Sequence, residues 1–208
     1  WALFISPIVC RWSLRIRITV QGWRKFCKSL DCLLARKRNM SLAEQIERLY
    51  HQQTTDYGQE YYDAFSELRQ GLNGGEIRAA EPAKGAGPSG WKANPWVKMG
   101  ILLGFRIGML EDMSVIAEHS EFPLYDKDTY PLKAIGMYSG ARVLPGGASI
   151  RDGSHLGKGV LCMPPMFINV GAYVGSNTMI DSHALVGSCA QIGERVHLSA
   201  AAQIGGVI

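Results

Sequence analysis

Three histidines near the C-terminal end of the sequence could bind a metal ion if their side chains converged. His155 and His197 lie 42 residues apart and share one position of a six-residue repeat. His183 occupies a different position of that repeat. A zinc site needs three or four ligands around one point. Because the spacing does not bring three imidazole rings together, we predict no metal site.

Two charged residues could take part in acid–base chemistry or in anion binding. Asp181 ends the motif Thr178-Met179-Ile180-Asp181, and Arg142 lies in the motif Gly140-Ala141-Arg142-Val143. A carboxylate can accept a proton, and a guanidinium can bind a carboxylate through two parallel hydrogen bonds. Taken alone, Asp181 is an ordinary corner residue and Arg142 an ordinary solvated charge. Cys189 is interpreted as structural rather than nucleophilic.

These residues lie in a part of the chain that repeats every six residues. Ten successive positions at this spacing are apolar, and nine of them are Ile, Leu or Val. The ten are Ile150, Leu156, Cys162, Ile168, Val174, Ile180, Val186, Ile192, Leu198 and Ile204. A helix of 3.6 residues per turn cannot keep such a stripe on one face, whereas short strands can. We therefore predict strands in which this aliphatic residue, and the mostly small residue two places before it, point inward.

Each strand is expected to end at a corner of the chain. Gly or Asp recurs directly after the aliphatic residue, and we expect it to tolerate the corner dihedrals. Pro164 and Pro165 also fall at a corner, where no hydrogen-bond donor of a strand is lost. Three strands would make one coil, and stacked coils would form parallel sheets. The predicted fold is therefore mainly β with a helical N-terminal region, and the β part is a parallel β-helix over residues 141–208.

The preceding part of the chain has helical patterning from residue 40 to about residue 72. Ser41 and Glu44 form a capping-box signature, and Asn73-Gly74-Gly75 provides a helix stop. Asn94-Pro95 predicts another helix, with Asn as its cap and Pro at its first position. We expect a small α-rich domain over residues 40–140.

Residues 1–39 differ from the rest in composition. They hold nine of the 22 basic residues and one of the 18 acidic residues, so the remainder has an excess of four acidic residues. Three interpretations remain open: translated upstream sequence before a start at Met40, an organelle transit peptide, or a nucleic-acid-binding arm. Under the first, which we favour, residues 1–39 are not part of the fold and the net charge of +4 indicates no nucleic-acid partner. The apolar run 2–10 is too short to span a membrane, so no membrane partner is expected.

Several short motifs of the sequence resemble those of the tetrahydrodipicolinate N-succinyltransferase family of hexapeptide-repeat transferases. Ahead of the repeat these are GEIRAAE at 75–81, WVK at 96–98 and ILLGFRI at 101–107. Within it they are NVGAYV at 169–174, TMID at 178–181, VGSCAQIGERVHLS at 186–199 and IGGV at 204–207. The resemblance covers about residues 60–208 and is strongest after Ile168.

The resemblance implies both a hand for the β-helix and an activity. The β-helix would be left-handed. The activity would be transfer of a succinyl group from succinyl-CoA to the amino group of ring-opened tetrahydrodipicolinate, in diaminopimelate and lysine biosynthesis. Succinyl-CoA would be a co-substrate, with no bound cofactor. Asp181 would bind substrate and take the proton of the attacking amine, and Arg142 would bind a carboxylate of the substrate.

The resemblance also implies an assembly and a location. Family members are homotrimers with active sites between subunits, so we expect a homotrimer. Five cysteines without a CxxC pair fit a reducing compartment, and we expect a cytoplasmic protein. One position departs from the family, which often has an aromatic residue two places after the Asp. His183 stands there in this chain, which could alter the contact with substrate.

Two other functions stay open at this point. One is a related hexapeptide N-acetyltransferase that uses acetyl-CoA, and the other is a non-catalytic solenoid. The repeat stops at Ile208 without a capping element. We therefore expect the chain to be the front part of a longer protein, cut off within the repeat.

Overall fold

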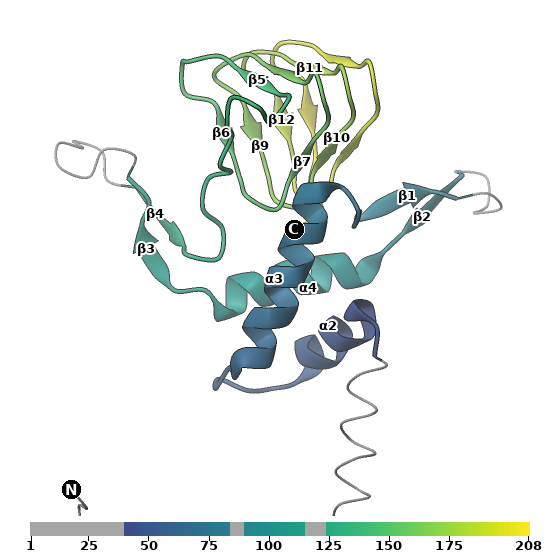
Figure 1. Ribbon diagram of the computed structural model, residues 1–208, viewed down its shortest axis with the longest axis vertical. Helices are drawn as coiled ribbons and strands as arrows, with labels where there is room; N and C mark the ends of the chain where they lie inside the picture. Colours follow the sequence, from purple (N-terminus) through teal and green to yellow (C-terminus); the bar gives the residue numbers. More distant parts are fainter. Residues whose placement is uncertain (1–39, 84–89, 115–123) are drawn as a thin grey trace, which may run out of the picture. The chain divides into compact units, whose positions relative to one another are not determined.

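The computed structural model describes residues 40–83, 90–114 and 124–208 (Figure 1). The basic segment 1–39 lies outside these residues, so none of its three interpretations is tested. The stretch Ser41–Ile208 forms one compact unit. Across the described ranges, no helix is both long enough and apolar enough to cross a membrane.

Three helices form the N-terminal region: α2 (Leu42–His51), α3 (Gln59–Gly74) and α4 (Pro95–Ile107). The predicted capping box is confirmed, since the Ser41 hydroxyl accepts from the Glu44 amide and the Glu44 carboxylate accepts from the Ser41 amide. The helical pattern expected from residue 40 to about residue 72 is confirmed, and it forms the two helices α2 and α3. Thr54 interrupts it, because its hydroxyl bonds the backbone of Asp56 and closes a turn between α2 and α3.

The predicted ends of α3 and α4 are confirmed in part. Gly75 follows α3 in the left-handed conformation, with φ of 79°. Pro95 is the first residue of α4, as expected. The Asn94 side chain, however, makes no cap to α4 and instead donates to the carbonyl of Arg78 at 2.9 Å. The Asn94 side chain therefore bonds an acceptor outside the helix and does not cap α4, although its position predicts a cap.

The helices pack around an apolar core, and two antiparallel ribbons extend on either side of them (Figure 1). The residues of this core that are fully buried include Ile46, Leu49, Leu68, Ile101 and Leu103. One ribbon pairs β1 (Ala80–Pro82) with β2 (Trp91–Ala93). The other pairs β3 (Leu110–Asp112) with β4 (Tyr125–Lys127).

The C-terminal region is a left-handed parallel β-helix of about four turns, which confirms the predicted fold class. Its first sheet comprises β5 (Arg142–Val143), β8 (Leu161–Cys162), β11 (Met179–Ile180) and β14 (His197–Leu198). Its second sheet comprises β6 (Ser149–Ile150), β9 (Phe167–Ile168), β12 (Leu185–Val186) and β15 (Gln203–Ile204). Its third sheet comprises β7 (His155–Leu156), β10 (Tyr173–Val174) and β13 (Gln191–Ile192). All neighbouring strands within these sheets are parallel.

The strands have the predicted register. Tyr173 pairs with His155 on one side and with Gln191 on the other, so each coil contains 18 residues. The second residue of nearly every strand is the aliphatic one and is buried inside the solenoid. Val143 and Leu156 are half-buried, and Ile204, in the last described strand, is 37% exposed. Pro164 and Pro165 lie between β8 and β9, at a corner as expected.

The corners differ from the prediction in one respect. The left-handed backbone position comes three residues after the aliphatic residue, not one. In the earlier coils glycine fills it, at Gly153, Gly159 and Gly171. In the later coils non-glycine residues fill it, with φ of 58° at Asn177, 61° at His183 and 64° at Cys189. The glycine directly after the aliphatic residue has another role. A Cβ at Gly175 would lie 2.6 Å from the backbone of Gly193 on the next coil, so glycine is required there by close approach.

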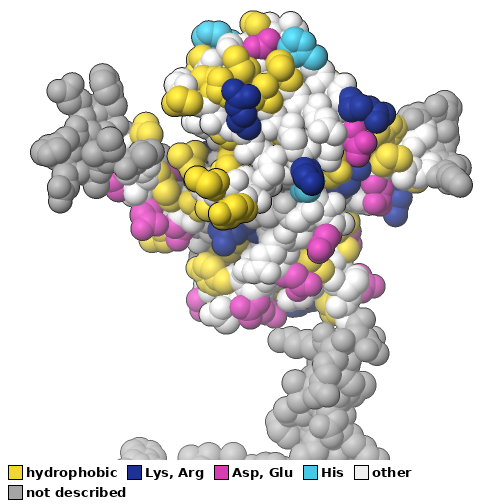
Figure 2. Space-filling model, turned by 45° about the horizontal axis from the view of Figure 1, so that its top comes forward, with side chains coloured by type: hydrophobic (Ala, Val, Ile, Leu, Met, Phe, Trp, Pro, Cys, Tyr) yellow, Lys and Arg dark blue, Asp and Glu magenta, His cyan; other side chains and the backbone are white. Residues whose placement is uncertain are grey.

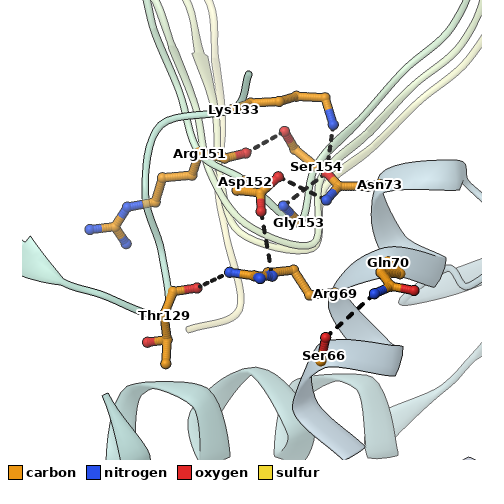
Figure 3. A network of polar contacts seen from close by, with 10 residues as sticks. All are labelled: Ser66, Arg69, Gln70, Asn73, Thr129, Lys133, Arg151, Asp152, Gly153 and Ser154. Atoms are coloured by element: carbon orange, nitrogen blue, oxygen red, sulfur yellow. Dashed lines mark hydrogen bonds and ion pairs between the residues drawn. The ribbon is translucent and has the colours of Figure 1, made fainter. Parts of the chain in front are cut away.

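A polar network joins the end of α3 to the first coils of the solenoid (Figure 3). Asn73 donates to Asp152 Oδ1 at 2.8 Å and accepts from the Gly153 amide at 3.0 Å. The Lys133 ammonium group donates to Asn73 Oδ1, and Arg69 forms an ion pair with Asp152 at 3.4 Å. These contacts fix the helices against the β-helix. The domain boundary that we expect at residue 140 stays a prediction.

Candidate functional site

The first sheet places one row of outward-facing side chains across four coils. Arg142 pairs with Leu161, Leu161 with Met179, and Met179 with His197. The residue that follows each of them in its strand faces the interior of the solenoid. Because successive side chains of a strand point to opposite faces, the row itself lies on the outer face.

Asp181 lies beside this row, directly after β11. Its backbone N–H donates to the carbonyl of Leu198 at 3.0 Å, which continues the ladder between β11 and β14. Its Oδ1 accepts from the Ser182 amide at 2.7 Å, and its Oδ2 lies 3.0 Å from Nε2 of His197. The hydrogen bond from Ser182, and then that from His197, hold the pKa of Asp181 below its usual value. The carboxylate is therefore charged and fixed in position on both oxygens.

A buried threonine sets the spacing of the two coils at this point. The Thr178 side chain is 1% exposed. Its hydroxyl donates to the Gly193 carbonyl at 2.8 Å and accepts from the Val196 amide at 3.1 Å. These bonds lock the coil that carries Asp181 onto the coil that carries His197.

Arg142 lies on the same face as Asp181 but does not contact it. β8 separates β5 from β11, so the two residues are two strand spacings apart, about 10 Å in the stacking direction. The Arg142 backbone is fixed by its bond to the Val160 carbonyl at 2.8 Å, and its side chain is exposed. The structure thus places both predicted site residues on one sheet, with a gap between them. It contains no ligand that would test their roles.

The other two histidines lie away from His197. His155 belongs to the third sheet, where its ring stacks on Tyr173 at 4.6 Å between centroids. His183 occupies the corner after β11 and is exposed. Among the residues with described positions, no group of three or more His, Cys, Asp or Glu side chains could hold a metal ion.

The two cysteines of the solenoid are buried free thiols. Burial raises the pKa of Cys162 and that of Cys189 to about 11 in each case. A thiol with so high a pKa is a poor nucleophile at neutral pH. This agrees with the interpretation of Cys189 as structural.

Arg78 is a functional candidate in the matched word GEIRAAE to which the sequence assigned no role. Its guanidinium lies 3.8 Å from the Tyr173 ring centroid, and its Nε donates to Gln191 at 2.9 Å. Both partners are outward-facing residues of the third sheet. Arg78 therefore holds the start of the β1–β2 ribbon on the solenoid. One weak sign of this contact in the sequence is the position of Arg78 shortly after the helix stop at Gly75.

The first two sheets keep apolar side chains on their outer faces. Leu161 and Met179 of the first sheet, and Phe167 and Leu185 of the second, are only half-buried. Hydrophobic side chains gather on the solenoid face turned forward in Figure 2, with histidine and acidic side chains near its upper rim. A cavity of about 230 Å³ lies close by and is lined in part by Tyr125, Arg151 and Phe167. Neither Asp181 nor Arg142 lines it.

Comparison with known proteins adds a decisive observation for the helical region. Residues 41–107 match the family model described as Tetrahydrodipicolinate N-succinyltransferase N-terminal. This stretch contains α2, α3 and α4. Residues 41–107 belong to that family. The resemblance read from the sequence words is thereby confirmed.

Curated relatives carry the name 2,3,4,5-tetrahydropyridine-2,6-dicarboxylate N-succinyltransferase. The protein of Xylella fastidiosa is 44% identical over 146 residues, which are 66% of this chain and 48% of that protein. The protein of Polynucleobacter asymbioticus is 43% identical over 150 residues, 70% of this chain and 51% of that protein. That of Bradyrhizobium diazoefficiens is 42% identical over 154 residues, 72% and 52% of the two chains. The chain thus spans about half the length of these N-succinyltransferases.

Proposed function

We propose that the protein transfers a succinyl group from succinyl-CoA to the amino group of ring-opened tetrahydrodipicolinate, in diaminopimelate and lysine biosynthesis. The observation that carries this proposal is the 44% identity to an N-succinyltransferase over two thirds of the chain. The N-terminal family match supports it independently of the repeat. This matters because a hexapeptide β-helix alone does not specify a chemistry.

The reaction needs a free amine at a thioester. The amine nitrogen loses a proton and bonds to the thioester carbonyl carbon, after which the C–S bond breaks and the CoA sulfur leaves. Asp181 is our candidate for the group that binds the amine and takes its proton, because its carboxylate is charged and held on the outer face of the first sheet. Arg142 is our candidate for a substrate carboxylate, because its guanidinium is exposed on that face.

The proposed active unit is a homotrimer. Within one chain Asp181 and Arg142 lie on an open face, about 10 Å apart in the stacking direction. The half-buried apolar residues of the same face could be covered by another subunit. A site between subunits would enclose the two charged residues and exclude water. The free thiols Cys162 and Cys189 fit a reducing compartment, and we propose a cytoplasmic location.

The test is thiol release by the full-length product of the gene that encodes this chain, assayed with tetrahydrodipicolinate. We expect a higher kcat/KM with succinyl-CoA than with acetyl-CoA. A preference for acetyl-CoA would reassign the protein as an N-acetyltransferase. Release with neither donor, from a folded trimer, would favour a non-catalytic solenoid.

A further inference from the structure

We propose that the cavity between α3 and the loop after β4 is a binding site for a dibasic amino acid. The α-carboxylate of this ligand would bind Arg69, its α-ammonium group would bind Asp128, and its side-chain ammonium group would bind Asp63. The inference stands on the cavity and the charges around it, and it does not depend on the proposed transferase activity.

The cavity lies between a helix face and a loop. Its volume is about 350 Å³, and small-molecule sites typically have volumes of about 300–1,000 Å³. Tyr62, Ser66 and Arg69 line it from α3, where spacings of three and four residues place them on one face of the helix. Asp128 and Thr129 line it from the loop after β4. No lining residue belongs to the first sheet, so this cavity is separate from the candidate site described above.

Arg69 supplies a cation that is already held in position. Its Nη1 donates to the Thr129 carbonyl at 3.2 Å, and its Nε lies 3.4 Å from Asp152 Oδ2 (Figure 3). Its guanidinium carbon also lies 5.7 Å from the centroid of the Phe65 ring. Among the described residues, Nη2 has no hydrogen-bond partner. A guanidinium fixed in this way can donate to a ligand carboxylate with little further loss of side-chain entropy.

Asp63 and Asp128 offer acceptors for two ammonium groups. Asp128 Oδ1 accepts from the Met109 amide at 2.8 Å, and Asp63 Oδ1 accepts from the Gln59 side chain at 2.9 Å. Within the described part of the chain, neither Oδ2 accepts a hydrogen bond. Each carboxylate is therefore oriented through one oxygen and can accept from a ligand through the other. Two carboxylates beside one guanidinium favour a ligand that carries two positive charges and one negative charge.

The spacing of these groups indicates the length of the ligand. Asp63 and Arg69 are six residues apart on α3, which is about 9 Å along the helix axis. Asp128 directly precedes Thr129, whose carbonyl binds Arg69, so the backbone of Asp128 is held at the Arg69 end. An α-amino acid with an ammonium group at the end of its side chain has its charges distributed in this way. The Tyr62 ring, which is 41% exposed, lines the same cavity and could contact the methylene groups of the ligand.

The first test compares three ligands in ligand-observed NMR titrations of the full-length protein. L-Lysine carries all three charged groups, L-norleucine lacks the side-chain ammonium group, and 1,5-diaminopentane lacks the carboxylate. Each exposed ion pair changes an affinity by up to about fivefold. We therefore expect saturable binding of lysine, and binding that is weaker by about threefold or more for each analogue. A lack of saturable lysine binding, or equal affinities for the three compounds, would overturn the proposal.

The second test uses two substitutions to check the orientation of the ligand. Asp63→Asn and Asp128→Asn each keep an oxygen that can accept the existing hydrogen bond, so the circular dichroism should stay that of the wild type. Asp63→Asn should weaken lysine binding about threefold or more and leave norleucine binding unchanged. Asp128→Asn should weaken the binding of both compounds. Glu67→Gln, at an exposed position of α3 that does not line the cavity, is the matched control and should change neither.

These variants can contradict the proposal in two ways. Lysine affinity that is unchanged in both aspartate variants would show that lysine binds elsewhere. Equal losses for lysine and norleucine in Asp63→Asn would show that Asp63 does not bind the side-chain ammonium group. If either variant fails to fold, the comparison of the three ligands on the wild type still decides whether the site exists.

Discussion

The Thr178 hydroxyl accepts a hydrogen bond from the backbone N–H of Val196 at 3.1 Å, and so joins the coil of Asp181 to that of His197. The same hydroxyl donates to the carbonyl of Gly193 at 2.8 Å. A single buried side chain therefore satisfies two backbone groups of the next coil. This arrangement gives the first of five predictions.

Thr178→Val removes the hydroxyl while keeping the shape of the side chain. We expect it to lower the free energy of unfolding by about 1–3 kcal/mol, because the Val196 amide loses its hydrogen-bond partner in a buried place. Chemical denaturation followed by circular dichroism measures this loss. Thr178→Ser keeps the hydroxyl and is the control. Equal midpoints for the valine variant and wild type would show that water replaces the threonine.

Gly175→Ala tests whether close approach, rather than backbone conformation, requires glycine after the aliphatic residue. A Cβ there would lie 2.6 Å from the Gly193 backbone, so the coils would have to separate. We expect a loss of about 1–3 kcal/mol in the free energy of unfolding. Gly193→Ala is the matched control in this 208-residue chain, because its Cβ would have Val196 at 3.8 Å as its nearest neighbour. Similar losses in both variants would contradict the explanation.

Under the proposed function, Asp181→Asn should greatly reduce turnover while the circular dichroism stays that of the wild type. The amide keeps the size of the carboxylate but loses the charge that holds His197 and supports proton removal. We expect kcat to fall by about 100-fold or more. Asp56→Asn, at an exposed position between α2 and α3, is the control for loss of an acidic residue. Near-normal turnover in Asp181→Asn would remove Asp181 from the site.

The same residue makes a prediction about pH. The folded-state pKa of Asp181 is lowered from 3.8, so its pairing contributes stability above that value. The contribution is lost only as the pH falls through the lower, folded-state pKa. Between pH 5 and pH 8, wild type and Asp181→Asn should therefore show the same dependence of unfolding midpoint on pH.

Cys162 and Cys189 should react slowly with iodoacetamide in the folded protein. Burial raises the pKa of both thiols from 9.0 to about 11, so roughly 100-fold less thiolate is present at pH 8 than for an ordinary cysteine. Peptide mapping by mass spectrometry measures the labelling rate of each site. Unfolding in guanidinium provides the control, since both sites should then react alike. Rapid labelling of native Cys189 would show an accessible thiol and contradict a purely structural role.

Much of the solenoid follows from its sequence because strand alternation has a period of two. Once the aliphatic residues fall every six positions, the inward-facing residues and the 18-residue register follow, as the pairing of Tyr173 with Gln191 confirms. The left-handed corner positions could not be predicted in this way. Cys189 and Arg195 share no property, and each is held there by a bond from its amide to the preceding coil.

The candidate site was predicted only in part, for a geometric reason. Asp181 and Arg142 were predicted because the motifs around them resemble those of the family, whereas the contact between Asp181 and His197 was not predicted. The 18-residue coil, which follows from the sequence, places His197 beside Met179 and so near Asp181, 16 residues before it. The bond also requires the imidazole to reach along the sheet toward the end of β11. Residue spacing alone carries no information on that direction.

The coil length restricts how a protein of this kind can change in length during evolution. Removal of six residues at a corner would rotate every later strand by one third of a turn, and His197 would leave the sheet that holds Met179. Removal of a whole coil keeps each strand in its own sheet but brings new neighbours together. Insertions that loop outward from a corner preserve both the core and the facing pairs, whereas indels of a full coil preserve the core and the sheets but change the pairs at the junction. Among homologous solenoids, length differences should therefore fall into multiples of one coil, apart from such external loops.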